Sequence, residues 1–191
     1  MLSALADNMD IVAHGAWAAV GLAWAQQRWR VPRRIAIATV AMAVLPDLVH
    51  LLPSAAWALL ADGSWTALRD YAVALPGHEP VTTPLVETLT HHLHCVLHSA
   101  VVAAAGSALA WRVWRGVPLW YLPLLGWWSH IVIDVFTHSA DFYPSPVLYP
   151  FTQWGFDGLA WNTPWFMALN YAVLLLCIAW LLTGRTKNGP R

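Results

Sequence analysis

The sequence predicts an all-α fold, a polytopic membrane bundle of about five transmembrane helices that forms one domain over residues 1–191. Of its 191 residues, 59% are hydrophobic and only 10% are charged, whereas soluble domains carry about a quarter charged residues. Five segments stay apolar long enough to cross a hydrocarbon core, which takes about 17 to 25 helical residues. Basic residues recur in alternate connections between these segments, as a multi-pass chain requires.

The five expected spans are residues 10–26, 34–52, 93–111, 117–136 and 164–182. Two longer connections, 53–92 and 137–163, fall on the same side of the membrane if the spans alternate in direction. The first carries Trp57 and Trp65 at positions that suit short helices lying in the headgroup layer. The second is rich in proline and aromatic residues, which favours a loop at the membrane interface.

The basic residues orient this arrangement. Nine of the ten fall in connections or tails that lie on one side, and Arg69 is the exception. The nine are Arg28, Arg30, Arg33, Arg34, Arg112, Arg115, Arg185, Lys187 and Arg191. Lys and Arg are enriched on the cytoplasmic side of membrane proteins, so we expect the N-terminus outside and the C-terminus in the cytoplasm. The first residues lack a basic start and a small-residue cleavage site, which argues against a signal peptide.

The acids and histidines collect on the opposite side. All ten Asp and Glu residues and all nine histidines lie in the outer connections or at the outer ends of spans. At about 1.5 Å of rise per residue, four spans bring polar side chains to the same outer third of the membrane. Ionisable groups at that depth are costly, and they mark ion sites, proton paths or catalysis.

The spacing of these residues predicts a metal site. His130, Asp134 and His138 follow one another at four-residue intervals in GWWSHIVIDVFTHSADFYP, so they share one face of a helix. The expected ligands are His14, Asp47, His50, His94, His98, His130 and Asp134. Histidine and carboxylate together suit a divalent ion, zinc first, and this many candidates would allow one ion or two.

Two further residues are candidates for general acid or base. They are His138, which follows the Asp134 turn, and Asp10, one turn before His14. Asp10 is equally well explained as an ordinary acid at a helix N-terminus.

With these residues in view, the chain resembles the bacterial membrane-bound metal-dependent hydrolase family typified by YdjM. The matching residues are His14, Asp47 and His50 in LPDLVH, His94, His98 and Ser99 in HCVLHS, and His130, Asp134 and Thr137 in SHIVIDVFT. The segment YPSPVLYP also resembles the family's proline-rich continuation. HCVLHS lacks the family's Arg and Thr, so His91 or His92 remains an alternative to His94.

The resemblance implies a hydrolase of the bacterial cytoplasmic (inner) membrane. The family is distantly similar to zinc-dependent phospholipase C, which implies a phosphoester or another ester of a lipid or lipid-linked substrate. The zero net charge gives no indication of a nucleic-acid partner.

Three other functions use the same residues. A metal-ion or proton transporter would need ionisable groups continuing toward the cytoplasm, and the inner halves of the spans lack them. A haem-binding electron carrier would use the histidines, but the neighbouring Asp residues favour a hard metal ion. A purely structural polar network is the third alternative, and so many imidazoles are an unusual way to build one.

Overall fold

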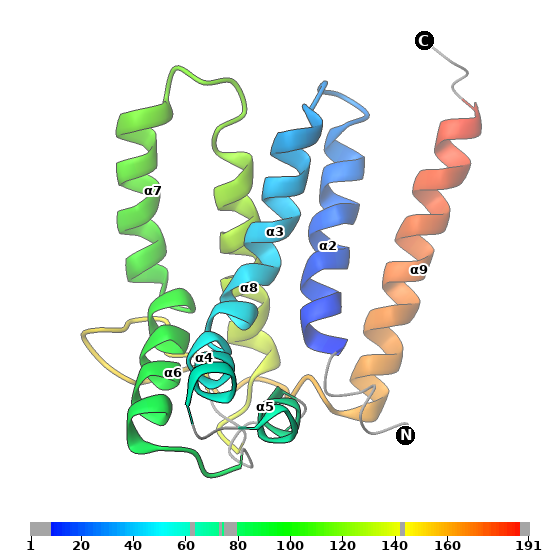
Figure 1. Cartoon of the computed structure of the whole chain (residues 1–191). Helices are drawn as coiled ribbons and strands as arrows, with labels where there is room; N and C mark the ends of the chain where they lie inside the picture. Colours follow the sequence, from blue (N-terminus) through cyan, green and yellow to red (C-terminus); the bar gives the residue numbers. More distant parts are fainter. Residues whose placement is uncertain (1–8, 62–63, 73, 75–79, 142–143, 188–191) are drawn as a thin grey trace.

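The computed structural model describes residues 9–61, 64–72, 74, 80–141 and 144–187, and all its regular structure in these ranges is helical (Figure 1). This confirms the all-α prediction. The helices are α2 (Met9–Ala25), α3 (Arg33–Val49), α4 (Leu52–Leu60), α5 (Trp65–Ala72), α6 (Pro84–Leu97), α7 (Ala100–Trp114), α8 (Leu122–Thr137) and α9 (Pro164–Lys187).

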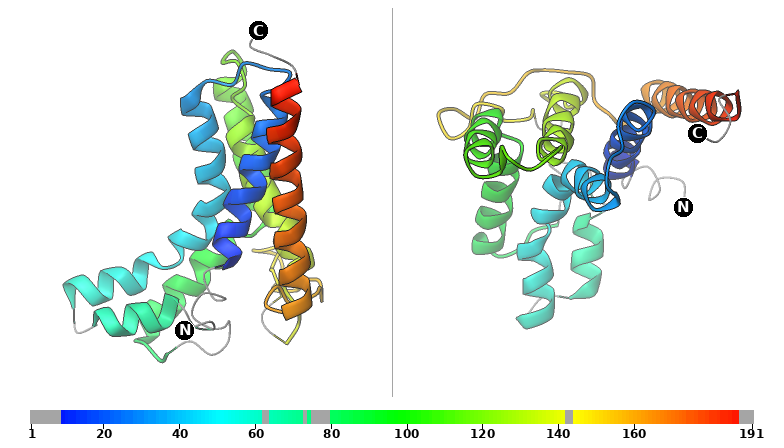
Figure 2. Two further views of the ribbon diagram at one scale, coloured as in Figure 1. Left: turned by 90° about the vertical axis from the view of Figure 1, so that its right-hand side faces the viewer. Right: turned by 90° about the horizontal axis from the view of Figure 1, so that it is seen from above.

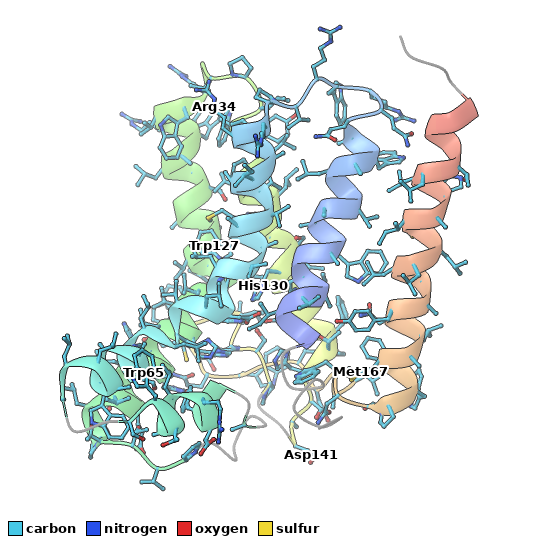
Figure 3. The ribbon with its side chains drawn as sticks, turned by 45° about the vertical axis from the view of Figure 1, so that its right-hand side comes forward. Arg34, Trp65, Trp127, His130, Asp141 and Met167 are labelled. Carbon is cyan, nitrogen blue, oxygen red and sulfur yellow. The ribbon has the colours of Figure 1, made fainter. Side chains whose placement is uncertain are left out.

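The helices α2, α3, α7, α8 and α9 stand side by side, and α4, α5 and α6 lie at one end of them (Figure 1). In the side view, α4 and α5 extend away from the bundle axis (Figure 2). Figure 3 shows Arg34 at one end of the molecule, Trp65 and Asp141 toward the other, and His130 between them. We call the end that carries Arg34 the arginine end. The opposite end, where α8 finishes at its C-cap His138, is the histidine end.

Two of the expected spans are broken near the histidine end. The 93–111 span is divided into α6 and α7, whose axes differ by 62°, and the 34–52 span ends at Val49 and continues into α4 at an angle of 59°. In the first case Ser99 causes the break, because its hydroxyl accepts hydrogen bonds from Val101 N and Val102 N and so starts a new helix. In the second, Pro53 in the first turn of α4 favours a helix start there.

The other boundaries follow from local chemistry too. α8 begins at Leu122 rather than at Val117, because a turn that contains Leu119 at a φ of 59° precedes Pro123 in its first turn. The expected spans 10–26 and 164–182 correspond closely to α2 and α9.

The helices differ in whether they are long and apolar enough to cross a membrane. Among the described helices, residues Pro164–Thr183 alone are long and apolar enough to cross a membrane unaided. The number rises to three if each bent pair counts as one span, and Ile11–Ala25 and Leu122–Thr137 are apolar but shorter. The five-span arrangement is therefore not confirmed by helix length and stays a prediction.

The close crossing of α3 and α8 positions the site. Gly126 lies against the α3 backbone, so that a Cβ atom there would collide with the Thr39 carbonyl group. One turn farther along α8, His130 Nδ1 lies 2.9 Å from the Ala43 carbonyl oxygen. The missing side chain at Gly126 thus lets α8 approach α3 closely enough for the imidazole to reach its backbone.

Candidate metal centre

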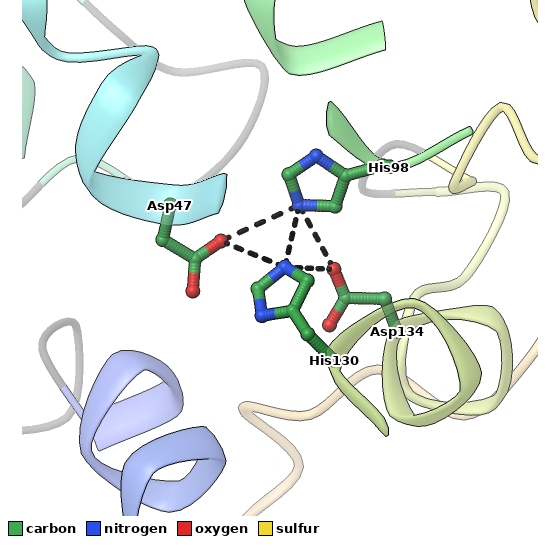
Figure 4. Close-up of side chains that lie close together, drawn as sticks. All are labelled: Asp47, His98, His130 and Asp134. Carbon is green, nitrogen blue, oxygen red and sulfur yellow. Dashed lines mark hydrogen bonds and ion pairs between the residues drawn. The ribbon is translucent and has the colours of Figure 1, made fainter. Parts of the chain in front are cut away.

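Four side chains converge at the histidine end of the bundle (Figure 4). They are Asp47 of α3, His98 at the C-cap of α6, and His130 and Asp134 of α8. Each offers one ligand atom, and these four atoms lie within 4.8 Å of one another. His98, His130 and Asp134 are fully buried, whereas the Asp47 side chain is 13% exposed. Asp47 is thus the member of the group that is nearest to solvent.

The shortest distances join the two imidazoles to each other and to Asp134. His98 Nε2 lies 3.0 Å from His130 Nε2 and 3.0 Å from Asp134 Oδ2, and His130 Nε2 lies 3.3 Å from the same carboxylate oxygen. Asp47 Oδ1 lies 3.4 Å and 3.5 Å from the two Nε2 atoms. These four atoms thus face one shared point.

The Nδ1 atoms of His98 and His130 determine which tautomer each ring adopts. His98 Nδ1 lies 2.8 Å from the His94 carbonyl oxygen, and His130 Nδ1 lies 2.9 Å from that of Ala43. A carbonyl oxygen can only accept, so each Nδ1 must carry the proton and donate it. In the neutral rings both Nε2 atoms then present lone pairs to the centre, which is how metal-binding histidines are oriented.

With both rings neutral, the centre brings together two imidazole lone pairs and two carboxylate oxygens, all of them acceptors. A divalent cation would satisfy all four atoms at once, and two nitrogens with two oxygens are a donor set that zinc and similar ions accept. The residues present fit the metal that the sequence predicts, and Asp47, His98, His130 and Asp134 would hold it.

Histidines end three of the helices that meet here. His50, His98 and His138 are the C-cap residues of α3, α6 and α8. His138 Nδ1 lies 3.1 Å from the Asp134 carbonyl oxygen, the bond that His98 makes in α6. Imidazole suits this position because it donates to the last-turn carbonyls of a helix. At the ends of α6 and α8, the histidine therefore has its Nδ1 already occupied by its own helix.

The remaining predicted ligands surround this group of four. His14 Nε2 lies 2.9 Å from Asp134 Oδ1, the oxygen that does not face the centre. The His94 ring stacks on His98 with centroids 3.9 Å apart, and the His50 ring meets His94 edge-on at 5.7 Å.

The two acid–base candidates differ in what can be said of them. His138 Nδ1 lies 3.9 Å from Asp134 Oδ1, so His138 borders the group of four. Asp10 belongs to α2, but its side chain lies outside the described part of the chain.

The alternatives to His94 lie apart from the centre. His91 Nε2 is 3.5 Å from Cys95 Sγ, and His92 Nδ1 is 2.6 Å from the Tyr149 hydroxyl. Both histidines are exposed, and neither belongs to the group of four.

Three hydrogen bonds that the sequence did not reveal hold the segment around His98 in place. On one side, Trp127 Nε1 donates to the Leu97 carbonyl at 2.7 Å. On the other, the loop after α8 is joined to the start of α7, where Ala100 N donates to the Val147 carbonyl at 2.9 Å and Ser99 Oγ donates to the Tyr149 carbonyl at 2.6 Å. The break between α6 and α7, where His98 lies, is therefore held by hydrogen bonds from α8 and from the loop after α8.

The Trp127→Phe variant is expected to bind metal about tenfold more weakly, the loss typical of removing a group that supports a ligand. Phenylalanine keeps a ring in the apolar cluster with Ala103 and Ile131, and removes the donor to Leu97 together with part of the indole volume. Trp128→Phe is the matched control, because Trp128 Nε1 donates to Ser107 Oγ at 3.0 Å, away from the ligands. Competition with a coloured chelator measures both affinities, and equal values would contradict the role of Trp127.

No protein-family model, curated protein or solved structure matches the chain.

Proposed function

We propose that the chain is a metal-dependent hydrolase of the bacterial cytoplasmic membrane that cleaves a phosphoester or another ester of a lipid or lipid-linked substrate. The observation that carries this proposal is the group of four acceptors, two of them imidazoles with fixed tautomers. A divalent ion there, zinc first, would polarise a scissile ester and make water more acidic.

A multi-pass arrangement with five spans is part of the proposal. α2, α3, α7 and α8 have 15 to 17 residues, which corresponds to about 22 to 26 Å at 1.5 Å per residue. A hydrocarbon core is about 30 Å thick, so helices of this length end a few ångströms inside it on at least one side, and the metal centre lies where α3 and α8 end. The arginine end would be cytoplasmic, with the N-terminus outside and the C-terminus inside, so that the centre faces the outer leaflet.

The chain's own residues then have distinct roles. Asp47, His98, His130 and Asp134 bind the ion. His14 Nε2, 2.9 Å from Asp134 Oδ1, pairs with that oxygen and so keeps Oδ2 turned toward the centre. His138 borders the centre without belonging to the group of four, which suits a general acid or base. Asp10 is a second candidate for that role, and a second ion would have to draw on His14, His50 or His94.

The test is to measure bound metal and hydrolysis together. The purified protein is expected to contain about one equivalent of a divalent metal and to hydrolyse a chromogenic phosphodiester or a short-chain phospholipid. His130→Ala should lose both properties, because it removes one of the four ligand atoms. His92→Ala is the matched control, since His92 is an exposed histidine that contacts Tyr149 instead. Equal turnover by wild type and His130→Ala would contradict the proposal.

One observation favours the transporter alternative. Both bent helix pairs are interrupted beside the metal centre, as discontinuous helices are at the ion sites of secondary transporters. Against it, the neighbouring core toward the arginine end is an apolar cluster of Ala103, Trp127 and Ile131, which leaves no polar continuation among these side chains. Metal uptake into proteoliposomes distinguishes the two functions, and we expect none above that of empty vesicles.

A further inference from the structure

Two rows of polar side chains run outward from the metal centre. One follows α3 into α4 and the other runs back along α6. The rows are Asp47, His50 and Ser54, and His98, His94 and Thr90. Helix α4 packs against α6, and the rings of His50 and His94 meet edge-on across the two rows. We call these six residues the polar seam.

The polar seam contains buried polar atoms that nothing in the described chain satisfies. Ser54 is only 1% exposed and is the one buried residue of α4, and Thr90 is 5% exposed. Neither hydroxyl has a hydrogen-bond partner among the described residues, and neither has Asp47 Oδ2. Buried polar atoms in native proteins are almost always bonded, to ordered water where protein offers nothing.

Thr90 also differs from the other described threonines that lie beyond the first turn of a helix. Four of these donate their hydroxyl to the carbonyl oxygen four residues earlier, at 2.8 to 3.0 Å; they are Thr39, Thr88, Thr137 and Thr183. The Thr90 hydroxyl makes no bond of this kind. Since the local partner is available to any helical threonine, the orientation of Thr90 indicates a different partner beside α6.

The metal centre can be reached from this side. Asp47, its partly exposed member, is also the inner end of one row of the seam. On another side, the apolar cluster of Ala103, Trp127 and Ile131 lies next to His130 in α8. The side of Asp47 is therefore the one where the centre is nearest to solvent and bordered by polar side chains.

We infer that the polar seam holds a file of ordered water molecules that connects the metal centre with the exterior at the histidine end. The water would satisfy Ser54, Thr90 and Asp47 Oδ2 in turn. That this water is a reactant depends on the proposed hydrolase function, but its presence does not.

Cysteine labelling tests the seam directly. In a Cys177→Ala background, Ser54→Cys and Thr90→Cys each place a thiol in the seam. Native Cys95 is the internal control, because it lies in α6 with 0% exposure and contacts His91 and Gln153 instead. With a charged methanethiosulfonate reagent, both new thiols are expected to react at least about tenfold faster than Cys95, whose burial makes it inert. Rates no faster than that of Cys95 would overturn the inference.

Radiolytic footprinting of the unmodified protein gives a second measurement that needs no variant. Hydroxyl radicals form from water, so Ser54 and Thr90, which bulk solvent barely reaches, should be modified while Trp127, in the apolar cluster, is spared once rates are corrected for intrinsic reactivity. Protection of both residues to the level of Trp127 would contradict a wet seam. A labelled seam in a protein without hydrolytic activity would instead count against the proposed function alone.

Discussion

The Gly126→Ala variant is expected to lose about 3 kcal/mol of unfolding free energy, the upper end of the range for overpacking a core. The added methyl group would meet the Thr39 carbonyl and lie 3.4 Å from Ala43 N, so α3 and α8 would have to separate. Separation lengthens the bond between His130 Nδ1 and the Ala43 carbonyl, now 2.9 Å, and releases the imidazole from its orientation. Metal affinity should therefore fall by about 10- to 100-fold as well.

Gly21→Ala is the control for this effect. Gly21 is also a helical glycine, but a Cβ atom there meets nothing within 4 Å. Alanine should therefore stabilise α2 by about 0.5 to 1 kcal/mol through its lower backbone entropy and leave metal binding unchanged. Denaturant unfolding in detergent gives the stabilities, and chelator competition gives the affinities. Gly126→Ala with the stability and affinity of Gly21→Ala would show that the close crossing is unimportant.

Asp134→Asn is expected to abolish metal binding with little change in shape, lowering affinity by more than about 100-fold, beyond the loss for a supporting residue. One Asp134 oxygen lies 3.0 and 3.3 Å from the Nε2 atoms of His98 and His130, and the other lies 2.9 Å from His14 Nε2. The amide keeps two polar atoms but loses the charge, and an NH₂ group turned toward the centre could not bind a metal. With its oxygen toward the centre instead, asparagine still offers the cation no negative charge.

Asp70→Asn is the matched control for that substitution. Asp70 pairs with Arg69 at 2.7 Å, but the two side chains are 51% and 72% exposed, and exposed pairs contribute roughly 0 to 1 kcal/mol. Elemental analysis of the purified variants should find metal in Asp70→Asn and none in Asp134→Asn. Stoichiometric metal in Asp134→Asn would remove this carboxylate from the ligand set.

The sequence located the centre through depth and helical spacing. Asp47, His98, His130 and Asp134 were all expected ligands, because counting along apolar segments brings them to one level. His94 shows the limit of spacing as a guide. Four-residue separation puts His94 and His98 on one face, yet their rings stack at 3.9 Å and turn their faces to each other. Ring orientation follows from the bond between His98 Nδ1 and the His94 carbonyl, which spacing alone does not specify.

Other features depend on contacts between segments far apart in the chain. Trp127 sits in an apolar, tryptophan-rich stretch and has no local feature that separates it from residues facing lipid. Its role depends on the Leu97 carbonyl, thirty residues earlier. The break at Ser99 was likewise hidden, because an apolar run of suitable length predicts a straight helix, whereas the serine hydroxyl starts a new one. A serine within an apolar run is the local signal for such a break, because serine is a preferred N-cap residue.

The loop after α8 is hydrogen-bonded to the break between α6 and α7. This contact joins a late part of the chain to an earlier one. Tyr149, whose carbonyl accepts from Ser99 Oγ, is synthesised fifty residues after that serine. During translation His98 therefore leaves the ribosome well before its final support exists. In the proposed hydrolase, the ion would therefore be held by a supported His98 only after the loop that carries Tyr149 has reached its place beside Ser99.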